Sequence, residues 1–218
     1  MARAAIVDVD GTLVDTNYHH TLAWYRSFRD HDVTIPVWKL HRHVGMGGDK
    51  YVAAVAGDDV EQRLGDDLRG RWEEIFEEMI PEIAPLPGAR DLLVGLKEQG
   101  LAVVIASSSF QDHLDVFLDL LDAREVVDDW TMKDDVEQSK PEPDLVRAAL
   151  DKAGTGDAFM IGDTPWDVES ARKAGIPTLC VLTGGFARAE LEKAGAAAVF
   201  ESVEEIAAGL DRALTPVS

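Results

Sequence analysis

The chain has 218 residues, of which 46% are hydrophobic and 28% are charged, a composition typical of a globular protein that can bury a full core. Acidic residues outnumber basic residues by 41 to 21, and the net charge of −20 argues against nucleic acid or an anionic membrane as partner, because binding to either depends on basic patches. The single cysteine, Cys180, rules out an internal disulfide and is predicted to be a small core residue.

No stretch approaches the roughly 20 consecutive apolar residues that a membrane helix needs. The longest clear apolar run covers residues 101–106. A strand is predicted within a few residues of the first methionine, which leaves no room for a signal peptide. We therefore expect a cytoplasmic protein, a monomer or a homodimer, with no membrane partner.

The first predicted element is a short strand that ends in two acidic residues. Small and β-branched residues at 4–7 lead into Asp8, Val9, Asp10 and Gly11, a pattern typical of a buried parallel strand followed by a turn. Ligands bind at the carboxyl edge of such sheets. Two ionised carboxylates placed together there repel by roughly 4 kcal/mol at an effective dielectric near 20, so they need a cation, a shared proton or water. The alternative is a solvated turn.

The next seventy residues are predicted to be helical, with no convincing strand. Leu22, Tyr25 and Phe28 recur at three-residue spacing, and further helices are expected over residues 37–44, 50–56 and 60–80. Three prolines and a glycine within residues 81–88 then mark a boundary.

Strands and helices alternate in the remainder of the chain. Helices are predicted over residues 89–99, 110–121, 143–153, 165–174, 187–194 and 203–214, and strands over residues 101–106, 125–127, 158–161, 178–182 and 197–200. This alternation indicates an α/β fold with a Rossmann-like core whose parallel sheet is covered on both faces. The core comprises residues 1–14 and 84–218, and residues 15–83 form an inserted, all-helical cap.

Three later stretches place polar residues where predicted strands end. Ser107, Ser108 and Ser109 follow one strand, and Ser109 is expected to be the N-cap of the next helix. Asp163 follows another strand, and Thr164, Pro165 and Asp167 suit positions N-cap, N1 and N3 of a helix. Lys140 precedes a proline, which by itself is typical of a solvated loop.

Four motifs together resemble those of the haloacid dehalogenase superfamily. They are DVDGTLVDT at residues 8–16, the apolar strand that ends in Ser107, KPEPD at residues 140–144, and the GDxxxD pattern at residues 162–167. The resemblance implies that Asp8 is a nucleophile that accepts a phosphoryl group and that Asp10 is the general acid and base, protonated for its acid role. It also implies that Ser107 holds the phosphoryl oxygens, with Gly11 and Ser108 as neighbouring substrate contacts, and that Lys140 neutralises Asp8 and the phosphate.

The resemblance also implies a magnesium site. Asp8, Asp163 and the backbone carbonyl of Asp10 would bind Mg²⁺, and Asp167 would support it through water or by capping. Charge counting points the same way. Ionised Asp8, Asp163 and Asp167 carry three negative charges and a phosphate monoester adds nearly two, so we expect both Mg²⁺ and Lys140 to be required.

Two stretches of the predicted cap are candidates for substrate contact. DTxxxHxxxW at residues 15–24 resembles the branch that includes β-phosphoglucomutase, which would place His20 near Asp10 or at the hinge; a partly buried helix histidine is the alternative. Residues 41–50 combine three glycines with Arg42, His43 and Lys50, and are expected either to close over the site and select the substrate or to form a solvated loop.

These patterns predict a Mg²⁺-dependent phosphatase that acts on a small phosphorylated metabolite and resembles phosphoglycolate phosphatases in its core motifs. A phosphomutase is the first alternative, although Gly48 and Gly162 stand where the mutase has an arginine and a glutamate. A non-catalytic module that binds a phosphorylated partner is the alternative from another class.

Overall fold

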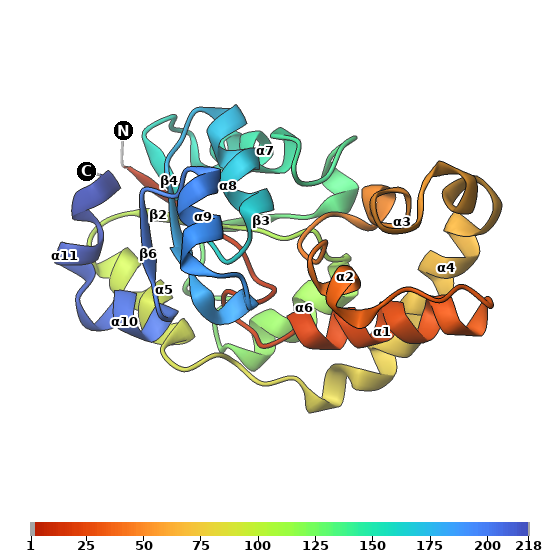
Figure 1. Cartoon of the computed structure of the whole chain (residues 1–218). Helices are drawn as coiled ribbons and strands as arrows, with labels where there is room; N and C mark the ends of the chain where they lie inside the picture. The colour runs from red at the N-terminus through yellow and green to blue at the C-terminus, as the bar shows by residue number, and fades with distance from the viewer. Residues whose placement is uncertain (1–2, 218) are drawn as a thin grey trace.

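The computed structural model describes residues 3–217. It contains a six-stranded parallel sheet, which lies at the left in Figure 1. The strand order is β3-β2-β1-β4-β5-β6. The strands are β1 Ala4–Val7, β2 Ala102–Ala106, β3 Asp129–Thr131, β4 Ala158–Gly162, β5 Thr178–Val181 and β6 Ala198–Phe200. In the register of the three central strands, Val7 lies level with Ile105 and Ile161. The chain segments that follow these strands therefore leave the same edge of the sheet together.

Helices cover the sheet and build the cap. The α-helices are α1 Asn17–Asp30, α2 Val37–His41, α3 Gly48–Ala56, α4 Asp58–Met79, α5 Ala89–Glu98, α6 Gln111–Leu120, α7 Asp144–Ala153, α8 Pro165–Ala174, α9 Arg188–Ala194, α10 Val203–Ala208 and α11 Leu210–Ala213. Short 3-10 turns are η1 Ile80–Glu82, η2 Lys133–Asp135, η3 Leu182–Gly184 and η4 Thr215–Val217. None of the helices between residues 3 and 217 combines the length and apolarity needed to span a membrane.

Alternate residues of each strand pack on opposite faces of the sheet. Ala5 and Val7 join the larger apolar cluster, to which α5, α6 and α10 contribute. Ala4 and Ile6 pack on the other face with side chains of α7 and α8. Both faces are thus apolar and covered, which is why β1 lacks the polar alternation of a half-exposed strand.

Helices α1 to α4 form the cap, seen in red to yellow beside the sheet in Figure 1. They surround an apolar cluster of their own that includes Trp24, Phe28 and Tyr51. The two connections to the core run side by side: Asp15 N donates to Ala84 O at 3.0 Å, and Leu86 N donates to Leu13 O at 2.9 Å. The predicted fold class is confirmed, while the domain boundaries at 14/15 and 83/84 stay a prediction.

Several predicted element boundaries are wrong. The strand expected at residues 125–127 lies at Asp129–Thr131, because the backbone N–H groups of Val126 and Val127 both donate to Ala123 O and close a turn after α6. The helix expected over residues 203–214 is interrupted at Gly209, whose backbone is not helical. The helix expected over residues 37–44 ends at His41, and the following turns include Gly45 at a φ of 90°.

Candidate active site

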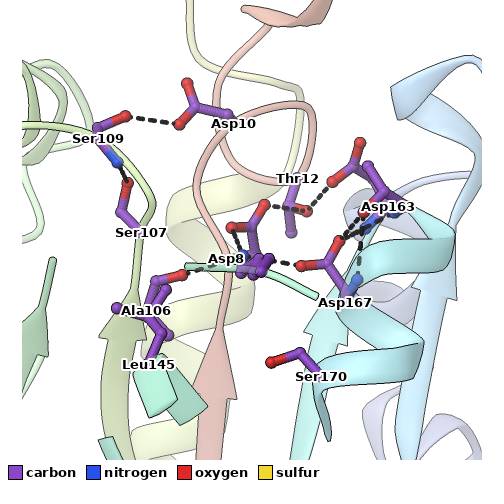
Figure 2. A network of polar contacts seen from close by, with 12 residues as sticks. Asp8, Asp10, Thr12, Ala106, Ser107, Ser109, Leu145, Asp163, Asp167 and Ser170 are labelled. Atoms are coloured by element: carbon purple, nitrogen blue, oxygen red, sulfur yellow. Dashed lines mark hydrogen bonds and ion pairs between the residues drawn. The ribbon is translucent and has the colours of Figure 1, made fainter. Parts of the chain in front are cut away.

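The side chain of Asp8 lies directly beyond β1, buried between the end of β2 and residues that follow β3 and β4. Lys140 Nζ donates to Asp8 Oδ1 and also lies 3.3 Å from Ala106 O. Thr12 Oγ1 lies 3.3 Å from Asp8 Oδ2 and 3.1 Å from Asp163 Oδ1, so it stands between the two carboxylates (Figure 2). Lys140 is 2% exposed although its sequence context by itself is typical of a solvated loop.

Three buried carboxylates converge at this point. Oxygen atoms of Asp8, Asp163 and Asp167 lie within 4.8 Å of one another. Burial raises the pKa of Asp8 to about 7, and the charges of Asp167 and Asp10 act in the same direction while Lys140 opposes them. Burial, followed by the charges of Asp167 and Asp8, raises the pKa of Asp163 well above its usual value. Burial and the neighbouring negative charges therefore both disfavour the charged forms of Asp8 and Asp163, and the Lys140 ammonium group opposes this effect.

The capping of α8 fixes the position of Asp167. Its Oδ2 accepts hydrogen bonds from Thr164 Oγ1 at 2.6 Å and Thr164 N at 3.0 Å, and Thr164 and Asp167 form a capping box with Pro165 in the first turn, as predicted. The other oxygen, Oδ1, lies 2.8 Å from Lys140 Nζ. A Cβ atom at Gly162 would collide with the Asp167 carboxyl group, so glycine at this position makes room for the acidic cluster.

This donor set suits a hard divalent cation. Mg²⁺ prefers oxygen ligands, uses one or two carboxylates and retains several waters. Asp8 and Asp163 offer buried carboxylate oxygens that lie within 4.8 Å of each other. The residues present therefore fit the predicted ion.

Asp10 points away from the acidic cluster, as Figure 2 shows. Its Oδ1 accepts from Thr16 Oγ1 at 2.7 Å and lies 2.9 Å from His20 Nε2, and its Oδ2 accepts from Ser109 Oγ at 2.8 Å. Burial opposes ionisation of Asp10, but His20, Thr16 and Ser109 together hold its pKa below the usual range. In this structure the surrounding donors favour the carboxylate form of Asp10. Its protonation for the acid role therefore stays a prediction.

Of the predictions for the serines that follow β2, the N-cap role of Ser109 is wrong, while the phosphate contacts of Ser107 and Ser108 stay predictions. Ser107 is fully buried, and its Oγ accepts from Ser109 N at 3.0 Å (Figure 2). Ser109 is not the N-cap of α6, because that position belongs to Phe110. The Ser109 hydroxyl instead donates a hydrogen bond to the Asp10 carboxylate.

Gly11 and His20, two predicted substrate contacts, lie close to the acidic residues. Gly11 has a φ of 75° and donates its N–H to Val14 O at 2.8 Å. A Cβ atom there would collide with Asn17 and Asp163, so the tight turn requires glycine. His20 lies beside Asp10, and its ring stacks on Phe76 with centroids 4.0 Å apart.

Arg42 and Lys50, the predicted cationic substrate contacts, connect the cap to the core. The Arg42 guanidinium forms an ion pair with Glu190 and lies 4.4 Å from the ring centre of Phe186. Lys50 Nζ donates to Gln138 Oε1 at 3.2 Å. Neither is among the described residues that line the cavity between cap and core.

That cavity, called the chamber below, lies between the cap and Asp10 and has a volume of about 60 Å³. Ser108, Ser109 and Asp10 form its core side. The cap side is formed by His20, Trp24, Val44, Gly45, Met46, Gly48, Tyr51 and Trp72.

Sequence reasoning missed several residues of the site. Thr12 and Asn17 both donate hydrogen bonds to the Asp163 carboxylate, and Asn17 Nδ2 lies 2.7 Å from Asp163 Oδ2. Thr16 donates to Asp10. These hydroxyl and amide side chains come within a few residues of the two acidic residues that follow β1. That closeness in sequence could have indicated them as hydrogen-bond donors to the site. Trp72 lies far along the chain in an ordinary helical pattern, and nothing in the sequence marked it as a chamber residue.

The sheet, the inserted cap and the acidic strand ends define a capped α/β enzyme. Residues 5–181 match the haloacid dehalogenase-like hydrolase family, and the chain belongs to that family.

Relatives extend over nearly the whole chain. The phosphoglycolate phosphatase of Rhodospirillum rubrum is 28% identical over 215 residues, which cover 92% of this chain and 88% of that protein. The crystal structure of a hydrolase from Pseudomonas syringae is 30% identical with a TM-score of 0.90, covering 96% of this chain and 98% of that one. CbbY from Rhodobacter sphaeroides, solved in complex with phosphate, is 26% identical with a TM-score of 0.77, covering 97% and 100%.

Proposed function

We propose that the protein is a Mg²⁺-dependent phosphatase that hydrolyses a small phosphate monoester through a phosphoryl group carried on Asp8. The observation that carries this proposal is the position of the Asp8 carboxylate, in contact with Lys140, next to Asp163 and two residues before Asp10. The names of the relatives that are phosphatases, and the phosphate bound by CbbY, support the same substrate class.

In the first step, a carboxylate oxygen of Asp8 attacks phosphorus and the bond from phosphorus to the alcohol oxygen breaks. The electron pair of that bond goes to the alcohol oxygen, which takes a proton from the Asp10 carboxyl group. Asp10 must be protonated beforehand, and the arrival of a dianionic phosphate close by favours this, because a neighbouring negative charge raises the pKa of a carboxyl group.

In the second step, the Asp10 carboxylate takes a proton from water and the water oxygen attacks phosphorus. The bond from phosphorus to Asp8 breaks, and Asp8 returns to its carboxylate form as inorganic phosphate leaves. Thr16, His20 and Ser109 stabilise Asp10 in the ionised state that this step requires.

Asp8 and Asp163 would hold Mg²⁺, which when bound supplies positive charge to the phosphoryl oxygens. Lys140 remains protonated beside them, because Asp167 and Asp8 hold its pKa above the usual value despite its burial. The hydroxyl of Ser107, whose oxygen already accepts from Ser109 N, remains available to donate to a phosphoryl oxygen.

The proposal is tested by measuring phosphate release from a panel of phosphate monoesters. Mg²⁺ is expected to be essential, with activity lost in EDTA and restored by added Mg²⁺. Asp8→Asn should lower kcat by at least about 10³-fold, whereas Asp66→Asn, at a fully exposed acidic side chain of the cap, should behave like the wild type. Equal turnover by Asp8→Asn, or full activity in EDTA, would contradict the proposal.

A further inference from the structure

The chamber has an aromatic wall made from one continuous stack of rings. Trp24 stacks on Tyr51 with centroids 4.5 Å apart and on Trp72 with centroids 5.3 Å apart. Trp72 in turn stacks on His20 at 5.5 Å, and all three pairs are within 26° of parallel. Because the Tyr51 hydroxyl donates to Leu40 O at 2.8 Å, the hydrogen-bonding group of this ring is already engaged within the cap.

The part of the chain that the structure describes gives the chamber no free cation. Among the described residues that line it, only His20 can carry a positive charge, and His20 already faces Asp10. Arg69 approaches the chamber residue Gly48, but its guanidinium forms ion pairs with Glu61 and Asp66, both at 2.8 Å. A second anionic group on a substrate could accept a hydrogen bond from the Ser108 hydroxyl, which has no other partner, but it would be buried without a counter-ion, which is costly.

Asp10 lines the chamber, and this fixes which part of a substrate lies there. In the proposed function Asp10 gives its proton to the alcohol oxygen, so the carbon frame of the alcohol extends from Asp10 into the chamber. The phosphate itself lies on the side of Asp8 and Lys140. The small volume and the aromatic wall of the chamber therefore select for the alcohol part of the substrate and not for its phosphate.

We infer that the substrate is the phosphate monoester of a small, uncharged alcohol with an apolar face, and that esters carrying a second anionic group, such as a carboxylate or a second phosphate, are disfavoured. This inference rests on the proposed phosphatase function and adds to it the chemical class of the leaving group. It separates the protein from phosphoglycolate phosphatases, since phosphoglycolate carries a carboxylate.

An isosteric pair of substrates tests the charge requirement directly. 2-Phosphoglycolate and its neutral amide, 2-phosphoglycolamide, have nearly the same size and differ by one charge. The wild type with Mg²⁺ should show a kcat/KM for the amide at least roughly 10-fold above that for phosphoglycolate, because only the carboxylate is buried without a counter-ion. A preference for phosphoglycolate, or equal kcat/KM values, would overturn the inference.

Variants of the chamber wall supply the second test. Met46→Lys places an ammonium group at the wall and should shift the ratio toward phosphoglycolate by roughly 10-fold, whereas Met46→Gln changes the same side chain without adding charge and should not. Trp38→Lys adds the same charge at a side chain that is 69% exposed on the cap and does not line the chamber. This control should keep the wild-type ratio. An unchanged ratio in Met46→Lys would contradict the inference.

A binding measurement keeps the inference separate from the proposed function. If no ester of the panel, these two included, is hydrolysed, the phosphatase proposal fails. The affinities of both compounds for the Mg²⁺-loaded wild-type protein are then compared through tryptophan fluorescence, to which Trp24 and Trp72 contribute. At least roughly 10-fold tighter binding of the amide would support the inference. Tighter or equal binding of phosphoglycolate, or no binding of either compound, would overturn it.

Discussion

Lys140 is the residue on which the charge balance of the site depends. Its ammonium group contacts Asp8 and Asp167, and all three side chains are almost completely buried. Buried charge pairs contribute little when intact, but loss of one partner leaves an uncompensated charge in a medium of low polarity. The same residue therefore serves catalysis and stability.

Lys140→Met is expected to lower the free energy of unfolding by about 3 kcal/mol, because Asp8 and Asp167 lose their cation. Urea unfolding at pH 8 without metal measures this effect. The double variant Lys140→Met, Asp8→Asn should recover part of the loss, since one of the two carboxylates is gone. Lys152→Met, whose ammonium group pairs with exposed acids, should cost less than about 1 kcal/mol. Wild-type stability in Lys140→Met would contradict the charge assignment.

At the scale of elements, polar contacts between cap and core hold the chamber closed. Arg42 pairs with Glu190, Asp49 accepts from Ser139, and His41 Nε2 lies 3.0 Å from Gly184 O. The Arg42 and Glu190 side chains are 31% and 43% exposed, so their ion pair is screened by water. The cap and core are therefore held together at this interface by several separate polar contacts.

Arg42→Met and Glu190→Gln are expected to raise KM by a similar factor of about 2 to 3, because each removes the same exposed ion pair. In the double variant the two effects should not add, which steady-state kinetics on all four proteins would show. A 100-fold rise in KM for Arg42→Met with none for Glu190→Gln would instead mean that Arg42 binds substrate, as the sequence suggested.

The sequence predicted the parts of this protein that are local. An apolar run of a few consecutive residues was enough to predict strand β1 and the position of Asp8 at its end. A capping pattern of similar length was enough to predict the start of α8 at Thr164, Pro165 and Asp167. Three-residue β3 was misplaced, because only its pairing with β2 distinguishes it from the preceding turn.

Contacts between different helices and strands could not be predicted from the sequence in the same way. The ring stack joins α1, α3 and α4, and its residues recur at spacings that any buried helix face shows. The ion pair of Arg42 depends on α9, nearly 150 residues later, which the composition of the loop at residues 41–50 does not reveal. Substrate selection depends on such contacts, so the sequence indicated the reaction class more closely than the substrate.

At the scale of the whole molecule, the net charge of −20 opposes the approach of an anionic substrate. The cations of the site act only at short range, because Lys140 is buried between carboxylates. Salt should therefore favour association by screening the repulsion.

The kcat/KM for a phosphate monoester is expected to rise severalfold when NaCl increases from about 0.01 M to about 0.3 M at saturating Mg²⁺, as the screening length falls. Steady-state assays with a neutral osmolyte in place of salt provide the control. A fall in kcat/KM with salt would show that attraction by the site outweighs the net charge.

The central claim is that Asp8 carries the phosphoryl group, and chemical trapping during turnover tests it most directly. Rapid acid quench with Mg²⁺ and substrate, followed by borohydride reduction and peptide mass spectrometry, should convert residue 8 to homoserine in the wild type and leave it unmodified without substrate. Reduction at another aspartate would contradict the account. So would the absence of any reduced aspartate when the enzyme turns over rapidly and releases a burst of alcohol.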